Sequence, residues 1–167
     1  SPKSFRILLL VALLAACQSD SRSIDERFSD AQLLLETEDY RAAAIELKNI
    51  LRDEPSNASA RLALGKLAFE TGAYADAEKE LSRALEFGIP AVDLLPVYAE
   101  VLLRLNKDEA LVELATAGLP SKQLSTVLAA KAVSSFKSGD VDSAEDLIQR
   151  ALTQTEISKF ALVSGAR

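Results

Sequence analysis

The chain has 167 residues, a formal net charge of −6 and 49% hydrophobic residues, which is enough apolar material for a folded core. The acidic balance argues against nucleic acid or an anionic membrane surface as a general partner, because both attract basic surfaces. Histidine is absent, which removes the commonest general base and metal ligand. We therefore expect no metal, no cofactor and no small-molecule substrate.

The first residues have the layout of a secretory signal. Lys3 and Arg6 precede an apolar run from Ile7 to Ala16. This run is too short to cross a bilayer, because a spanning helix needs about 20 apolar residues. Residues 1–16 are therefore predicted to be a signal peptide.

A single cysteine follows this run, so no disulfide can form within these residues. The residues before it complete a pattern that resembles a bacterial lipobox: Leu14, Ala15, Ala16 and Cys17. The resemblance implies cleavage before Cys17 and lipidation of its sulfur, with residues 17–23 as a polar tether. Cleavage would remove Lys3 and Arg6, so the net charge would change from −6 to −8.

Two stretches of the chain repeat each other at a constant spacing. Five residues of the first stretch, Tyr40, Ala43, Glu46, Leu47 and Leu51, return as Tyr74, Ala77, Glu80, Leu81 and Leu85. The spacing is about 34 residues, which is the period of tetratricopeptide (TPR) helix-turn-helix units, and the chain resembles them. Such units stack because none can bury its apolar face alone. The sequence therefore predicts an all-α TPR solenoid over residues 24–157.

Small residues recur at the positions where helices are expected to cross. Two helices approach to about 8–10 Å only where the crossing point carries little side chain. We expect Gly65 to face Ala77, and Ala31 to face Ala43. The predicted packing positions are Ala31, Ala43, Gly65, Ala77, Ala99, Ala132 and Ala144.

Each predicted repeat contains a first helix, a turn with Gly, Asp or Asn, and a second helix. The expected boundaries are 24–57, 58–91, 92–124 and 125–157. Pro55 stops the second helix of the first repeat. The third repeat is degraded, because Asp108 replaces tyrosine, Leu111 replaces alanine, and Gly118-Leu119-Pro120 cuts its second helix short.

The first helices of the repeats are expected to line a groove, which is the candidate binding surface. Its candidate residues are Gln32, Leu35, Lys66, Phe69, Glu70, Glu100, Arg104, Val133 and Phe136. By default the apolar members also belong partly to the core. TPR modules that clamp a C-terminal carboxylate use a cluster of lysine and asparagine there. The residues expected along the centre of the groove in this chain are Gln32, Lys66, Glu100 and Val133. This set does not support such a clamp.

No catalytic arrangement is evident. Carboxylates such as Glu36 and Glu38 are spaced as solvated helix surface, and the glycines at Gly118 and Gly139 lack phosphate-cradling spacing. Without histidine, the Ser-His and Cys-His forms of nucleophile activation are also excluded. We predict that these residues are not an enzyme.

Three segments together with the lipobox resemble one family. They are Asp39 to Asn49, Ala60 to Gly65, and Ala77 to Leu81 with Arg83 to Leu85. They are similar to the start of the large TPR lipoproteins that accompany the exosortase and PEP-CTERM surface-sorting system (PrsT-like). The resemblance implies a non-catalytic scaffold that binds cell-envelope proteins or peptides, in PEP-CTERM protein sorting and exopolysaccharide production.

Members of that family are longer. Residues 158–167 are expected to begin a fifth repeat, with Phe160, Leu162 and Val163 on its first helix, so the chain is expected to be an N-terminal fragment. Gln18 after the cysteine, in place of aspartate, favours the periplasmic side of the outer membrane of a Gram-negative bacterium. Two alternatives remain open: a TPR lipoprotein of pilus or outer-membrane assembly, and the anchor region of an enzyme whose catalytic domain lies beyond Arg167.

Overall fold

The computed structural model describes the backbone of residues 22–164 and the side chains of residues 22–156. The lipobox and the side chains of Phe160, Leu162 and Val163 lie outside these ranges. Within them the regular elements are all helical, which confirms the predicted fold class. The helices are α2 (Ile24–Glu36), α3 (Tyr40–Asp53), α4 (Ala58–Glu70), α5 (Tyr74–Glu86), α6 (Ala91–Arg104), α7 (Asp108–Glu113), α8 (Ser121–Ser138) and α9 (Val141–Ser164).

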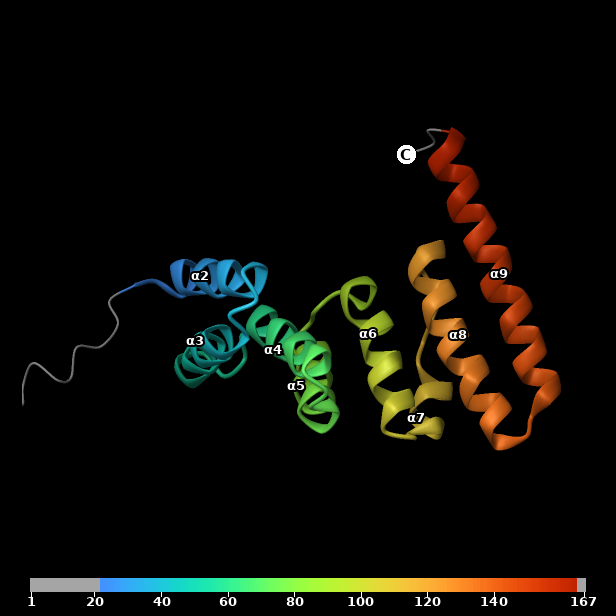
Figure 1. Cartoon of the computed structure of the whole chain (residues 1–167), viewed down its shortest axis with the longest axis horizontal. Helices are drawn as coiled ribbons and strands as arrows, with labels where there is room; N and C mark the ends of the chain where they lie inside the picture. Colours follow the sequence, from blue (N-terminus) through green and yellow to red (C-terminus); the bar gives the residue numbers. More distant parts are fainter. Residues whose placement is uncertain (1–21, 165–167) are drawn as a thin grey trace, which may run out of the picture.

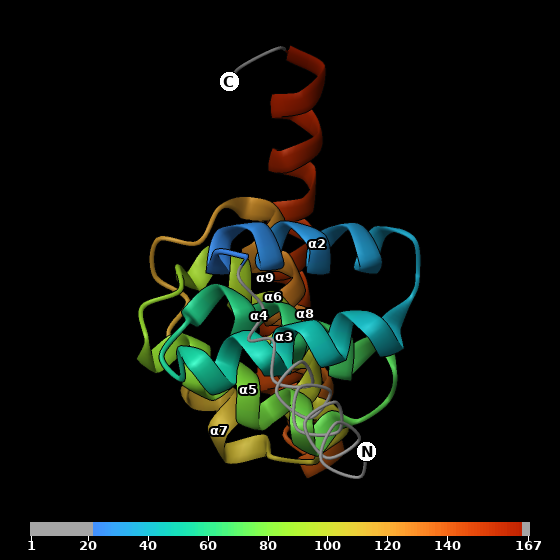
Figure 2. The same ribbon diagram turned by 90° about the vertical axis from the view of Figure 1, so that its left-hand side faces the viewer.

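The helices form hairpins that follow one another in a row. α2 packs on α3, α4 on α5, α6 on α7 and α8 on α9, and each hairpin contacts the next. Figure 1 shows this row, with α2 and α3 at one end and α8 and α9 at the other. The C-terminal part of α9 projects beyond the other helices (Figure 2). The described chain is therefore a solenoid, in which each hairpin is covered by its neighbours.

Polar side chains cap the N-terminal ends of α2, α3 and α4. Ser23 and Glu26 form a capping box at α2, in which Ser23 Oγ accepts from the backbone of Glu26 and the Glu26 carboxylate accepts from Ser23. Asp39 caps α3 by accepting from the Ala42 N–H at 3.1 Å, and Asn57 caps α4 in the same way. In each of these helices, one of the N–H groups that a helix start leaves without a partner is thereby satisfied.

The turn inside each hairpin contains one residue in the left-handed backbone region. These residues are Glu38, Gly72, Asn106 and Gly139, with φ angles of 60°, 77°, 54° and 86°. They recur once in each repeat at nearly equal spacing, so the turn geometry keeps the period of the sequence. Glycine adopts this conformation without a steric penalty, and asparagine tolerates it better than most residues. The conformation is kept even where the residue type is unfavourable, as at Glu38.

All seven predicted packing residues are buried. The contact at Gly65 differs in detail from the expectation, however. A Cβ atom placed on Gly65 would lie 2.7 Å from Cγ of Leu81, so the helices meet most closely one turn beyond Ala77. The large Leu81 side chain thus occupies the space that the glycine leaves open. Ala77 is itself fully buried in the same interface.

An ion pair joins the two helices in each of the first two hairpins; it is partly buried in the first and buried in the second. Arg27 Nε lies 3.0 Å from Glu46 Oε1, and Arg61 Nη1 lies 2.5 Å from Glu80 Oε2. Arg27 also donates to Asp53 at 2.6 Å, and this bond, followed by the attraction of Glu46, raises the pKa of the guanidinium. Because both arginines are charged and nearly out of solvent, the carboxylates are needed to offset their desolvation.

The last two hairpins carry leucine at the equivalent positions. Leu95 and Leu114 stand one repeat after Arg61 and Glu80, and Leu128 and Leu147 stand at the corresponding places of the fourth hairpin. Leu95 belongs to the main core cluster, and Leu114 packs against it. The same structural position is therefore occupied by an ion pair in two hairpins and by apolar side chains in the other two.

Three helix boundaries differ from the sequence-based expectation. α7 ends at Glu113, before Gly118, and Lys131 Nζ donates to the carbonyl oxygens of Val112 and Leu114 where this helix stops. α8 begins directly after Pro120, ahead of the expected start of the fourth repeat at 125. α9 continues through residue 158 to Ser164, because no Gly or Pro interrupts it there, so no new helix begins at 158.

Overpacking the interface between α4 and α5 should destabilise the protein. Ala77→Leu adds three carbon atoms at a fully buried site, and we expect it to lower the free energy of unfolding by about 1 to 3 kcal/mol. Ala75→Leu is the matched control, because Ala75 lies on the exposed face of the same helix and its replacement should cost at most about 0.5 kcal/mol. Urea unfolding measures both values. Equal losses would contradict this packing register.

The leucine pairs suggest how the buried ion pair of α4 and α5 can be replaced. Arg61→Leu alone leaves Glu80 buried without its main partner, and we expect a loss of about 3 to 5 kcal/mol. The double variant Arg61→Leu with Glu80→Leu recreates the arrangement of Leu95 and Leu114, and should retain more stability than either single variant. Urea unfolding of the three variants tests this. Additive losses would show that the pair is not interchangeable with leucine.

Candidate functional site

The large hollows of the described surface include three that each lie beside a first helix of a hairpin. The N-terminal groove, of about 640 Å³, lies between α2, α4 and the start of α6. The C-terminal groove, of about 930 Å³, lies between α6, α8 and α9. The third hollow, of about 850 Å³ and here called the polar cleft, lies between α7, α8 and α9. Each could hold a segment of another molecule.

The N-terminal groove combines apolar and polar lining. Phe28 and Leu35 of α2 and Leu62 of α4 are half-buried apolar side chains along it, while Gln32 and Lys66 are exposed polar ones. Lys66 makes no ion pair with a carboxylate in the described part of the chain. The polar groups are therefore available to orient a ligand that the apolar surface holds.

The C-terminal groove is the more apolar of the two. Val133 and Phe136 of α8 are 48% and 66% exposed, and Leu152 of α9 is 55% exposed, although all three face the same hollow. Contiguous exposed apolar surface of this kind marks interaction sites. Burial of these side chains against a partner would contribute a favourable free energy of about 25 cal/mol for each Å² of apolar surface removed from water.

Charged side chains stand at one end of the C-terminal groove. Arg104 lies over the ring of Tyr74, with its guanidinium carbon 5.9 Å from the ring centroid, and Lys137 donates to the side-chain oxygen of Asn106. Neither cation is paired with a carboxylate among residues 22–156. Glu100, one turn before Arg104, supplies a negative charge in the same groove. A ligand would therefore meet apolar surface flanked by charges of both signs.

The structure brings together eight of the nine predicted groove residues, but in two separate hollows. Gln32, Leu35, Lys66 and Glu70 line the N-terminal groove, and Glu100, Arg104, Val133 and Phe136 line the C-terminal groove. Phe69 lines neither. Its side chain packs against the main core cluster, and its ring centroid lies 5.9 Å from that of Tyr74. The structure therefore places Phe69 on the core side of this face, as the expected dual role of the apolar members allows.

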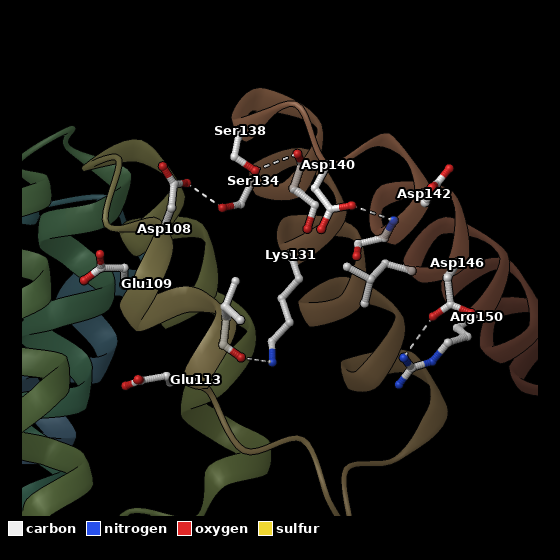
Figure 3. A pocket seen from close by; sticks show the side chains of 14 residues that line it. Asp108, Glu109, Glu113, Lys131, Ser134, Ser138, Asp140, Asp142, Asp146 and Arg150 are labelled. Atoms are coloured by element: carbon white, nitrogen blue, oxygen red, sulfur yellow. Dashed lines mark hydrogen bonds and ion pairs between the residues drawn. The ribbon is translucent and has the colours of Figure 1, made fainter.

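The polar cleft was not foreseen. Its floor is formed by Lys131, Ser134, Ser135 and Ser138 of α8, and its two walls by the start of α7 and the first turns of α9. Figure 3 shows these side chains around Lys131, with Asp108 on one side and Asp140, Asp142 and Asp146 on the other. The sequence does contain a signal of this cleft. The four floor residues correspond, one repeat earlier, to Tyr98, Val101, Leu102 and Leu105, so polar residues stand where the preceding repeat has mostly apolar ones.

Hydrogen bonds and one ion pair join the residues of the cleft to one another. Ser134 Oγ donates to Asp108 Oδ1 at 2.5 Å, and Asp146 pairs with Arg150 at 3.2 Å. Hydrogen bonds from Ser143 lower the pKa of Asp140, which caps α9. Burial, followed by repulsion from Arg150, lowers the pKa of Lys131. The cleft thus holds its half-buried cation, Lys131, by hydrogen bonds to backbone carbonyl oxygens.

Two further observations limit what the described residues can do. They contain no group of three or more acidic, histidine or cysteine side chains placed to hold a metal ion. Between residues 22 and 164, no helix combines the length and the apolar character needed to cross a membrane.

Comparisons with known proteins agree with this geometry. Residues 29–92 match a family model described as tetratricopeptide repeat. The crystal structure of MamA superposes with a TM-score of 0.73 at 17% identity, covering 89% of this chain and 85% of that one. The crystal structure of YrrB, described as a TPR protein with an unusual peptide-binding site, superposes with a TM-score of 0.50 at 18% identity, covering 93% and 98%. No curated protein matches the sequence.

These findings define the class of molecule. The helix pairs, their order and the family match show a TPR solenoid, a fold whose usual role is protein–protein interaction without catalysis. At these levels of identity, the structural likeness shows the fold alone.

Proposed function

We propose that this protein is a lipid-anchored scaffold that binds a peptide segment of a cell-envelope protein in its C-terminal groove. The observation that carries this proposal is the exposed apolar surface of Val133, Phe136 and Leu152, which lines a hollow on a fold used for protein interactions. An extended or helical segment with apolar side chains fits this surface. Arg104, Lys137 and Glu100 would select its polar ends.

The cellular part of the proposal rests on the sequence. The resemblance of Leu14 to Cys17 to a lipobox supports a lipid anchor in the outer membrane, on the periplasmic side. The resemblance of residues 39–85 to PrsT-like proteins supports a role in PEP-CTERM protein sorting and exopolysaccharide production. The acidic balance of the chain is compatible with a protein partner and disfavours nucleic acid.

Site-specific crosslinking in cells tests the groove. A photoreactive residue at Val133 should capture a cell-envelope protein, whereas the same residue at Val141 should not. Val141 is a suitable control, because it is similarly exposed but lines none of the three hollows. Val133→Asp should abolish capture at Phe136, because it places a charge in the apolar surface.

The identity of the captured protein separates the alternatives. A PEP-CTERM substrate or a component of its sorting machinery would support the proposed process. A pilus or outer-membrane assembly protein would assign the chain to the rival role. Equal capture at Val133 and Val141 would contradict the groove as the binding site.

Replacement of the lipobox cysteine tests the anchor. Cys17→Ser should leave an uncut precursor in the inner membrane, whereas the natural chain should fractionate with the outer membrane. Firm attachment needs more than one acyl chain, so labelled palmitate should be incorporated in the natural chain and not in the variant. Palmitate label that persists in Cys17→Ser would contradict lipidation at this residue.

A further inference from the structure

The polar cleft is found where the preceding repeat has a filled core. In that repeat, Val101 and Leu102 are buried at the positions equivalent to Ser134 and Ser135, and Leu105 packs against them at the position of Ser138. The serine side chains are shorter and polar. A hollow of about 850 Å³ remains between α7 and α9 as a result. Serine at these three positions leaves space and polar groups that the preceding repeat does not have.

The cleft has many more negatively charged than positively charged side chains. Its two cations are Lys131 and Arg150. Its six carboxylates are those of Asp108, Glu109, Glu113, Asp140, Asp142 and Asp146. Glu109, Glu113 and Asp142 form no ion pair within residues 22–156, whereas Asp146 is paired with Arg150. Three carboxylates on the two walls are thus available to a positively charged ligand.

One largely buried residue on the floor has a hydroxyl without a hydrogen-bond partner among the described residues. The Ser135 side chain belongs to a residue that is only 9% exposed, and its hydroxyl makes no hydrogen bond in the part of the chain that the structure describes. The residue lines the cleft, and no buried side-chain polar atom of the described residues is both sealed from solvent and unpaired. The hydroxyl therefore faces the hollow, where a bound donor can satisfy it.

We propose that the polar cleft is a second binding site, which accepts a basic segment of a partner protein through lysine or arginine side chains. Val112 and Leu147 line the cleft beside the carboxylates and offer apolar surface to the aliphatic stems of such side chains. The charged ends then reach the free carboxylates of both walls and the Ser135 hydroxyl. A bare metal ion fits less well, because no three ligands among the described residues converge.

This site is separate from the proposed peptide groove. Among the described residues, no side chain lines both the polar cleft and the C-terminal groove, because they lie on different faces of α8. Val133 and Phe136 of this helix face the groove, and Lys131, Ser134 and Ser135 face the cleft. The second site can therefore be tested without disturbing the first.

The matched variants Val112→Arg and Ile45→Arg test the proposal. The two side chains are similarly exposed, at 55% and 53%, and both variants add one positive charge, but only Val112 lines one of the three hollows. The probe is a fluorescein-labelled peptide of alternating alanine and arginine, and its counterpart with glutamine in place of arginine is the uncharged control. Fluorescence anisotropy of the purified protein at low salt measures binding.

The natural protein should bind the arginine peptide and not the glutamine peptide. Val112→Arg should weaken this binding by about tenfold or more, because the new guanidinium occupies the cleft and neutralises its walls, whereas Ile45→Arg should change it by less than about twofold. The neutral variant Glu109→Gln, Glu113→Gln and Asp142→Asn should act like Val112→Arg. Its control with the same charge change is Glu36→Gln, Asp76→Asn and Glu86→Gln, on distant exposed positions.

Thermal unfolding shows whether a variant that loses binding is still folded. Val112→Arg should melt no lower than the natural protein, because it relieves repulsion between carboxylates at an exposed position. The proposal is overturned if the natural protein does not bind the arginine peptide, if both peptides bind equally, or if the cleft variants and their controls lose binding to the same extent. The last outcome would show attraction by net charge alone.

Discussion

The stack depends on the close approach of its helices at small residues. At Gly65 even one added carbon atom would lie 2.7 Å from the Leu81 side chain, and the equivalent alanines of the other hairpins are buried at the same kind of crossing. A larger side chain would push the helices apart and open the core on both sides. This constraint returns once in every repeat, and it leaves residues away from the crossing free to vary between repeats.

At positions away from the helix crossings, the repeats differ in where they place polar side chains. Each of the first two hairpins pairs a buried arginine with a glutamate between its own helices, at Arg27 with Glu46 and at Arg61 with Glu80. The last two hairpins have leucine there, which avoids the cost of removing two charges from water. In the fourth hairpin polar groups instead line an open cleft. Charges that serve the fold at one end of the molecule are thus replaced, at the other end, by charges that face solvent.

The features that follow from residue spacing could be predicted from the sequence. The repeat period indicated the helical solenoid and the burial of all seven small residues, because a crossing point demands small side chains whatever surrounds it. Eight of nine groove residues line a hollow for a similar reason, since they occupy the same face of successive first helices. Phe69 lies apart from both hollows, because an aromatic side chain at the edge of that face can turn inward to Tyr74 and the core.

Features that depend on contacts between repeats could not be predicted in this way. The end of α7 at Glu113 involves Lys131, which lies in the next hairpin and donates to the carbonyl oxygens near this end. The uninterrupted course of α9 reflects the lack of a local breaker, although the repeat register favoured a turn there. The polar cleft was not predicted, because serine is common in helices. The change from apolar to polar residues becomes evident only when Ser134 and Ser135 are compared with Val101 and Leu102 one repeat earlier.

The position of α8 between two different hollows explains how a short solenoid can serve as a scaffold. Because successive residues of a helix point in different directions around its axis, residues 133 and 136 face one side and residues 131, 134 and 135 face another. α8 packs on α6, α7 and α9, and these contacts hold it in place without covering either surface. An apolar segment on one side and a basic segment on the other would not compete for any described side chain. One helix could therefore hold two partners side by side, which a single groove could not do.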